Sequence, residues 1–172
     1  WQDALSRTAR LSSVSSLNDI DGNPVIDRGR VYALNHSGRM VAIDLRSGER
    51  VWDANIGGIH TPWIAGDYIF VLSSDGKMTC LSLRDGRIKW VTPLQRFKDP
   101  EDRKGLIRWT GPVLAGDRLI VVSSHGYALS LSPFNGEILG GEKLPSGSGI
   151  QPIVAGGTLY ILADNGDLIA YR

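Results

Sequence analysis

The chain has 172 residues, and its 19 basic side chains nearly balance its 18 acidic ones, which leaves a formal net charge of +1. This balance argues against a dedicated nucleic-acid binder, because such proteins normally carry a strongly basic face. Hydrophobic residues make up 42% and charged residues 22%, which is the composition of a folded soluble domain, and no apolar run approaches the ~20 residues of a membrane-spanning helix.

The start of the chain carries neither the basic nor the apolar segment of a signal peptide. We therefore expect any export signal to lie outside the 172 residues. Cys80 is the single cysteine, so the chain can form neither an internal disulfide nor a cysteine-rich zinc site.

Four prolines open four copies of an internal repeat, at Pro24, Pro62, Pro112 and Pro152. A glycine stands 14 residues after each proline, at Gly38, Gly76, Gly126 and Gly166. Another glycine follows 10 residues later in the first three copies, at Gly48, Gly86 and Gly136. A repeat of this length is typical of arrays and propellers.

Apolar columns in the repeats predict the strands in chain order. The second strand of each copy is expected at residues 31–34, 69–72, 119–122 and 159–162. Because these residues are apolar without alternation, both faces of the strand are expected to be buried. Glycine-containing pairs after each strand, such as Asp75-Gly76 and Asn135-Gly136, predict two-residue hairpin turns.

Each copy thus contains four short antiparallel strands in about 40 residues, the unit of a β-propeller blade. We predict an all-β chain that forms a partial propeller with about four blades. Its expected parts are the end of a preceding blade with its connection at 1–18, a blade at 19–58, a blade at 59–107 with a charged insertion at 94–107, a blade at 108–147 and an incomplete last blade at 148–172.

The segments AIDLRSGERVW (42–52) and LSLRDGRIKW (81–90) resemble the A-x-D-x-x-T-G-x-x-x-W signature of quinoprotein-type, or PQQ-like, propeller repeats. Over essentially its whole length the chain is most similar to the C-terminal half of the BamB family, the lipoproteins of the outer-membrane β-barrel assembly machinery. The most specific segments are 18–25 (NDIDGNPV), 31–34 (VYAL), 42–48 (AIDLRSG) and 165–172 (NGDLIAYR).

The resemblance implies that this chain is about half of an eight-bladed ring. It implies that Trp1 closes a preceding blade and that Trp52 and Trp90, which end the first two repeats, dock between neighbouring blades as structural residues. In the third repeat Gly140 stands at this position. The glycines of the repeat have the same structural role.

The resemblance also implies a non-catalytic scaffold without a cofactor, on the periplasmic side of the outer membrane, with a lipid anchor outside this chain. Its expected partners are BamA, other barrel-assembly subunits and nascent outer-membrane proteins. In the family an Asp-x-Asp before the first strand of a blade helps to bind BamA, and Asp19 and Asp21 match it. The family's other contact, a Leu-x-Leu-Arg segment, would precede Trp1. The alternative is that both aspartates are ordinary turn residues.

Other polar residues have structural interpretations. The mixed charges of the insertion 94–107 predict a solvated loop, with a partner contact as the alternative. Cys80 shares a repeat column with small residues, which predicts a packing slot. His36, His60 and His125 fall at three different repeat positions, so they are not expected to ligate a metal.

Two rival functions stay open at this point. One is a propeller that binds a small molecule, sugar or peptide on its face. The other is a piece of a quinoprotein dehydrogenase, although those enzymes hold their quinone with an adjacent-cysteine disulfide that this chain lacks. The chain would either close as four blades, with the Trp1 segment supplying the last outer strand, or expose sheet faces and edges that favour self-association.

Overall fold

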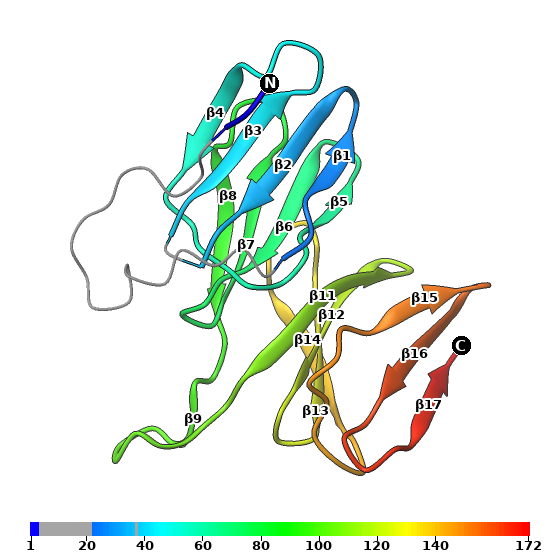
Figure 1. Cartoon of the computed structure of the whole chain (residues 1–172). Coiled ribbons are helices and arrows are strands. Elements are labelled where there is room, and N and C mark those ends of the chain that lie inside the picture. Colours follow the sequence, from blue (N-terminus) through cyan, green and yellow to red (C-terminus); the bar gives the residue numbers. More distant parts are fainter. Residues whose placement is uncertain (4–21, 37) are drawn as a thin grey trace.

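The chain forms four successive antiparallel sheets, which we call blades 1 to 4 (Figure 1). The structure is a computed structural model that describes residues 1–3, 22–36 and 38–172. Blade 1 consists of β1 (Val25–Asp27), β2 (Arg30–Leu34), β3 (Met40–Asp44) and β4 (Arg50–Ala54), and blade 2 of β5 (Trp63–Ala65), β6 (Tyr68–Leu72), β7 (Lys77–Ser82) and β8 (Ile88–Pro93). Blade 3 consists of β11 (Trp109–Ala115), β12 (Arg118–Ser123), β13 (Tyr127–Leu131) and β14 (Ile138–Lys143), and blade 4 of β15 (Ile153–Ala155), β16 (Thr158–Leu162) and β17 (Leu168–Tyr171). The prediction of an all-β chain built from four-stranded blades is confirmed.

The second strand of each complete blade is buried on both faces, as its apolar run predicts. In β6, Ile69 and Val71 pack into the core between blades 1 and 2, whereas Phe70 and Leu72 pack into the core between blades 2 and 3. Side chains alternate across a strand, so one apolar run serves two interfaces. The β-branched and aromatic residues of these runs suit such pleated, buried positions.

Separate apolar clusters join the blades in sequence. Blades 1 and 2 share one cluster, blades 2 and 3 share a second, and blades 3 and 4 share a third that includes Val122, Leu144 and Ile161. The short first strands β1, β5, β11 and β15 contact one another in that order. This arrangement is that of a propeller, in which the first strands line the axis and the sheets stack side by side.

The turns after the second and third strands are longer than the two-residue hairpins predicted there, since Leu72 pairs with Met78 and Leu131 with Ile138. In blade 1, Leu34 pairs with Met40, and the Asn35 side chain accepts a hydrogen bond from the backbone N–H of Arg39 at 2.9 Å. Ser73 and Ser123 accept the equivalent bonds in blades 2 and 3. A side-chain acceptor just after the second strand therefore stabilises a longer loop than the two-residue turn that the glycine-containing pair predicts.

Two-residue turns occur instead between the first and second strands. Asp27 pairs with Arg30, so that Arg28 and Gly29 form the turn with positive φ values of 45° and 74°. The equivalent pairs in the other blades are Gly66-Asp67, Gly116-Asp117 and Gly156-Gly157. Positive backbone angles in such tight turns favour glycine, and every one of these pairs contains one.

The insertion between blades 2 and 3 contains a hairpin of β9 (Phe97–Asp99) and β10 (Lys104–Leu106). Its strands are largely exposed, as expected of a solvated segment. Its base is fixed, because the Trp109 indole donates a hydrogen bond to the Gln95 carbonyl at 2.8 Å. The insertion is therefore a projecting hairpin in place of the loop predicted from its mixed charges.

Candidate partner-binding surface and inter-blade contacts

The predicted partner-binding residues Asp19 and Asp21 lie outside the described residues. The described chain resumes at Gly22, whose α-carbon lies so close to the backbone of His60 that an added Cβ would stand 2.8 Å from the His60 carbonyl oxygen. The next residue, Asn23, donates its backbone N–H to the Thr61 hydroxyl at 3.3 Å. The residues that follow the Asp-x-Asp are thus held against the loop that leads into blade 2.

The four blades begin at equivalent segments, which we call together the leading rim: the loop residues 22–24, 59–62 and 149–152, and residues 109–112 at the start of β11. Neighbouring loops are tied to each other, since Gln151 donates its side-chain amide to the Pro112 carbonyl at 2.8 Å. Two apolar side chains of the rim are exposed, Ile59 by 38% and Ile150 by 59%. The rim thus presents two exposed isoleucines on backbone segments that are tied to neighbouring blades.

His60 is the ionisable side chain among the described residues of the leading rim. Burial lowers the pKa of its imidazole below the ordinary value, and a backbone hydrogen bond with Trp109 acts in the opposite direction. The net direction favours the neutral ring at neutral pH. His60 is therefore a neutral side chain that bonds to the Trp109 backbone of blade 3, while its own carbonyl lies against Gly22 of blade 1.

Tryptophans at the blade ends form a periodic contact with the next blade. The indole N–H groups of Trp1, Trp52 and Trp90 donate to the carbonyls of Leu45, Leu83 and Pro133, each at 3.0 Å. Each acceptor lies in the turn between the third and fourth strands of the following blade, where Gly48, Gly86 and Gly136 have positive φ values of 75°, 69° and 76°. These bonds are the contacts that Trp52 and Trp90 make with the next blade, where the resemblance implies that the two indoles dock.

The glycines of these turns are required by space as well as by backbone angle. A Cβ on Gly86 would stand 2.6 Å from the Trp52 ring, and one on Gly136 would stand 2.5 Å from the Trp90 ring. The other repeat glycines, Gly38, Gly76, Gly126 and Gly166, lie in the loops after the second strands and also have positive φ. Both glycine columns of the repeat thus occupy turns.

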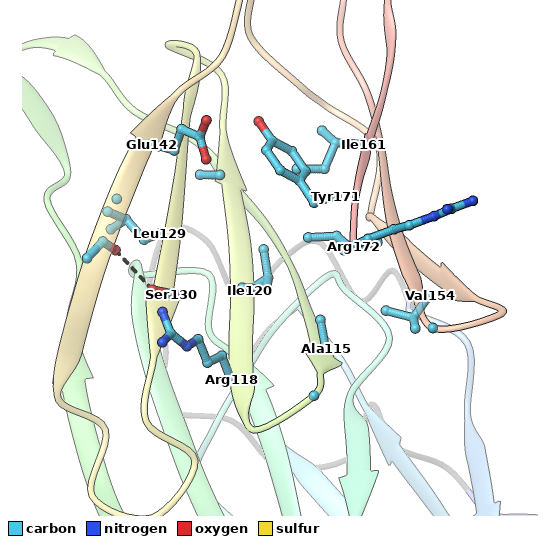
Figure 2. Close-up of a pocket in the computed structure, with 16 residues that line it drawn as sticks. Ala115, Arg118, Ile120, Leu129, Ser130, Glu142, Val154, Ile161, Tyr171 and Arg172 are labelled. Atoms are coloured by element: carbon cyan, nitrogen blue, oxygen red, sulfur yellow. Dashed lines mark hydrogen bonds between the residues drawn. The ribbon is translucent and has the colours of Figure 1, made fainter.

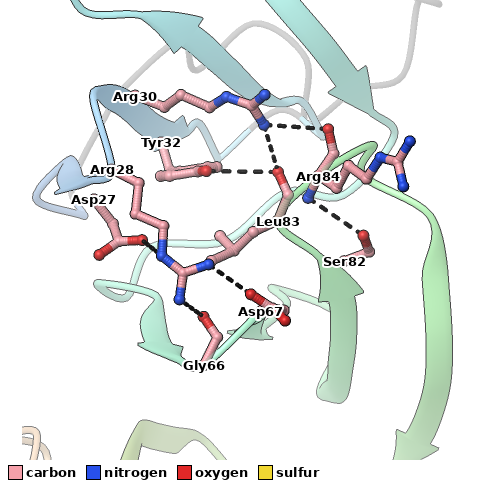
Figure 3. A network of polar contacts seen from close by, with 9 residues as sticks. All are labelled: Asp27, Arg28, Arg30, Tyr32, Gly66, Asp67, Ser82, Leu83 and Arg84. Atoms are coloured by element: carbon pink, nitrogen blue, oxygen red, sulfur yellow. Dashed lines mark hydrogen bonds and ion pairs between the residues drawn. The ribbon is translucent and has the colours of Figure 1, made fainter.

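A polar network also joins blades 1 and 2, and Figure 3 shows its residues, which include Arg28, Arg30 and Leu83. The Leu83 carbonyl, which accepts from Trp52, also accepts from the Arg30 guanidinium at 2.9 Å. Arg28 forms an ion pair with Asp67 at 2.5 Å and donates to the Gly66 carbonyl at 3.0 Å. These contacts join the turns of two blades at the end of the sheets opposite the leading rim.

An open groove lies at the matching place between blades 3 and 4 (Figure 2). It has a volume of about 620 Å³, and Ile120, Leu129, Val154, Ile161 and Gly140 are among its lining residues. Glu142 and Tyr171 face each other across it (Figure 2), and the pKa of the Tyr171 phenol is raised first by burial and then by the Glu142 carboxylate. Gly140 holds the repeat position of Trp52 and Trp90, so no indole fills this space.

The remaining candidate side chains are structural in the described chain. Cys80 is 1% exposed, and burial raises the pKa of its thiol to about 11, which suppresses the reactive thiolate at neutral pH. His125 shares a hydrogen bond of 3.0 Å with Ser124. Within residues 1–3, 22–36 and 38–172, no three His, Cys, Asp or Glu side chains gather closely enough to hold a metal ion. The same residues include no helix with the length and apolar character needed to cross a membrane.

Arg28, Asp67 and Arg30 were not singled out by the repeat pattern, although they join two blades. A signal was present in the sequence, because the fourth and fifth residues after each repeat proline form a glycine-containing pair. That pair marks the tight turns that carry Arg28 and Asp67. The identity of the bonding partner, however, depends on how neighbouring blades are stacked.

Residues 1–92 match the family described as outer membrane protein assembly factor BamB. The chain is 30% identical to the assembly factor BamB of Salmonella typhimurium, covering 99% of this chain and 41% of the relative. It is 25% identical to the BamB of Moranella endobia, with coverages of 99% and 42%. The chain therefore spans about two-fifths of the length of the curated relatives that it matches.

Solved structures show the same fold. BamB from Moraxella catarrhalis aligns with a TM-score of 0.77 at 21% identity, over 91% of this chain and 45% of that one. The computationally designed Ika4 protein aligns with a TM-score of 0.70 at 11% identity, over 91% and 92% of the two chains. A quinohemoprotein alcohol dehydrogenase from Comamonas testosteroni aligns with a TM-score of 0.58 at 19% identity, over 73% and 21%. These likenesses establish a propeller fold.

Proposed function

Because the chain belongs to the family of outer membrane protein assembly factor BamB, we propose that it acts as a protein-interaction scaffold in the assembly of outer-membrane proteins. The observation that carries this proposal is the family match over residues 1–92, which includes Asp19, Asp21 and the start of the leading rim. The proposed location is the periplasmic side of the outer membrane, reached through a lipid anchor on the longer parent protein.

The proposed partner of the leading rim is BamA, the barrel-forming subunit. Two aspartates spaced by one residue on an extended segment would point the same way. Carboxylates in that arrangement suit an arginine or lysine of the partner, because hydrogen bonds between ionised groups are the stronger ones. Gly22 and Asn23, which directly follow the two aspartates in sequence, contact the loop that leads into blade 2.

The proposed role is non-catalytic. Cys80 is buried with a raised thiol pKa, Trp52 and Trp90 make inter-blade contacts, and His125 shares a hydrogen bond with Ser124. Rigid blades with exposed rims suit a role in holding other proteins. The likeness to an alcohol dehydrogenase concerns the fold, and folds host many unrelated functions.

A second proposed contact concerns nascent outer-membrane proteins. The outermost strand of blade 3, β14, is exposed along all six of its residues. An exposed strand edge can pair with an extended segment of another chain through backbone hydrogen bonds. Photo-crosslinkers placed along β14 should capture unfolded barrel precursors, and labelling of BamA alone would contradict this contact.

The BamA proposal is tested in the full-length parent protein with Asp19→Ala and Asp21→Ala combined. We expect recovery of BamA in co-purification to fall about tenfold or more, since charge-assisted contacts are lost. The matched control is Asp85→Ala with Asp117→Ala, which removes the same charge from turns at the opposite end of the blades. Undiminished recovery with the first pair, or equal losses with both pairs, would contradict a specific role of the Asp-x-Asp.

A further inference from the structure

A groove lies between the turns of blades 1 and 2, at the end of the sheets opposite the leading rim, and we call it the arginine groove. It has a volume of about 440 Å³. Among the described residues, its charged lining side chains are four cations and one carboxylate: Arg28, Arg30, Arg84, Lys89 and Asp67. The whole chain has a formal net charge of only +1. The positive charge of this groove is therefore a local feature of the two blades.

Arg28 occupies a backbone position at which the other blades have glycine. It stands in the first turn of blade 1, and the equivalent residues in blades 2, 3 and 4 are Gly66, Gly116 and Gly156. Its φ of 45° lies in the left-handed region, as do the glycine φ values of 58°, 61° and 58°. A residue with a Cβ is strained at this angle. Since strained positions cluster at functional sites, Arg28 is a candidate binding residue.

The groove already holds one carboxylate. The Arg28 guanidinium forms an ion pair with Asp67 at 2.5 Å and donates to the Gly66 carbonyl at 3.0 Å. The Asp67 side chain is 81% exposed, so this pair stands in water and contributes little to stability. The pair shows which chemical group the groove accepts, namely a carboxylate that reaches an arginine from the solvent side.

Arg30 is fixed in position while its charge is not neutralised. Its Nη1 group donates to the backbone carbonyls of Leu83 and Arg84 at 2.9 and 3.1 Å (Figure 3). Carbonyl oxygens orient a guanidinium but carry no net charge, and a guanidinium has five N–H donors in all. In the part of the chain that the structure describes, Arg30 forms no ion pair with a carboxylate. Its positive charge is thus oriented in advance for an anion.

Two more cations line the groove from blade 2. Arg84 and Lys89 are exposed, and neither forms an ion pair within the described residues. Asp85 of the same turn forms its ion pair with Arg87 at 3.5 Å. Tyr68, which is 43% exposed, adds an aromatic ring to the lining. Arginine and tyrosine are enriched where proteins bind each other, so this composition favours a protein as the occupant.

We propose that the arginine groove binds an acidic segment of a partner protein, with one carboxylate of the partner at Arg30 and another at Arg84 and Lys89. Arginine suits this role because its planar fork holds a carboxylate through two hydrogen bonds. Asp67 covers Arg28 in the free chain, and a partner carboxylate replaces it there. The groove and the leading rim lie at opposite ends of the blades. This proposal therefore goes beyond the proposed contact with BamA and does not depend on it.

Removal of the resident carboxylate gives the first test, in the full-length parent protein. Asp67→Asn frees Arg28 and should tighten the binding of a dye-labelled oligo-glutamate peptide about threefold, the size expected of an exposed ion pair. Fluorescence anisotropy at low ionic strength measures the affinity. The matched control Asp117→Asn makes the same change of charge at the same repeat position of blade 3, outside the groove. It should alter the affinity less, and equal effects of the two variants would overturn the proposal.

Charge reversal tests the other side of the groove. Arg84→Glu combined with Lys89→Glu should weaken peptide binding about tenfold or more, because attractive charges become repulsive. The control Arg46→Glu with Lys98→Glu changes the same two residue types at exposed positions outside the groove. Equal losses in both double variants, or no binding by the unsubstituted protein, would contradict the proposal.

A membrane surface is the competing occupant. Vesicles of phosphatidylglycerol and phosphatidylcholine separate the two, because they present phosphate groups without a peptide. We expect the Arg84→Glu, Lys89→Glu variant to lose peptide binding and to sediment with vesicles as the unsubstituted protein does. Loss of vesicle binding with unchanged peptide binding would show that the groove faces lipid, and would overturn the proposal.

Discussion

The contact between blades 1 and 2 differs from that between blades 3 and 4 at one repeat position. Trp52 fills the first contact, where it lies 5.8 Å from the Tyr32 ring between centroids and bonds to the Leu83 carbonyl. Gly140 stands in its place in blade 3, beside a groove of about 620 Å³. Blades 3 and 4 still share an apolar cluster. The comparison shows that aliphatic packing joins the sheets, while the tryptophan closes their outer edge.

We expect the largest effect from removing the Trp52 indole from the contact between blades 1 and 2. Trp52→Ala removes a ring that is 9% exposed and leaves a cavity against Gly86, so the free energy of unfolding should fall by about 3–5 kcal/mol. Chemical denaturation measures the change. Val51→Ala, on the same strand with 41% exposure, is the control and should cost less than about 1 kcal/mol. Similar losses for both variants would argue against a docking role for the indole.

The second prediction concerns the glycine beneath the indole. Gly86→Ala combines a positive φ of 69° with a Cβ 2.6 Å from the Trp52 ring, so we expect a loss of about 3 kcal/mol from backbone strain and overpacking. Gly166→Ala has a φ of 92° but open space around it, and should lose only the strain part, about 1 kcal/mol. Thermal unfolding of the two variants separates strain from steric contact, and equal losses would contradict the steric explanation.

Gly140 allows a test at the open groove between blades 3 and 4. Gly140→Trp should raise the free energy of unfolding by about 1 kcal/mol, because the ring enters an existing groove and a glycine leaves a strand interior. Space is available, since a Cβ on Gly140 would meet only the Ser130 hydroxyl at 4.0 Å. Gly140→Ala should raise the free energy of unfolding by about half as much, because it removes the strand glycine without adding a ring. Loss of stability in the tryptophan variant would show that the groove cannot accept an indole.

The smallest expected effect lies at the leading rim. His60 has a lowered pKa, so the unfolded chain binds its proton first as the pH falls. The stability that the neutral ring contributes is present above the ordinary imidazole pKa near 6.5 and is lost as the pH falls through the lowered pKa of the folded chain. His60→Gln should remove this part of the pH dependence, as judged from urea midpoints at pH 7 and pH 5. An unchanged pH dependence would contradict the assignment to His60.

The strands could be predicted from the sequence because each blade repeats the same burial pattern. Residues such as Val71 and Val121 occupy one apolar column, and both are fully buried. The rule is local, since alternate residues of a short run face alternate sheets. The docking of Trp52 and Trp90 between blades came instead from the family resemblance, and a large flat side chain suits such a sheet-to-sheet contact.

The turns and cross-blade bonds could not be predicted in the same way. Loop width depends on whether a residue such as Asn35 or Ser73 bonds to the far side of its own loop. The Arg28–Asp67 pair depends on the offset between two stacked sheets, which a repeat pattern does not contain. The role of Asp19 and Asp21 stays a prediction, because both lie outside the described residues.

The direction of the tryptophan contacts has a consequence for synthesis. Trp52 donates to a carbonyl 31 residues later in the chain, and Trp90 to one 43 residues later. Because a ribosome releases the chain from its N-terminus, a blade can complete its own strands before the acceptor of its indole exists. The indole contacts of blades 1 and 2 can therefore form only after the following blade is present, whereas blade 3, with Gly140, makes no such contact with blade 4.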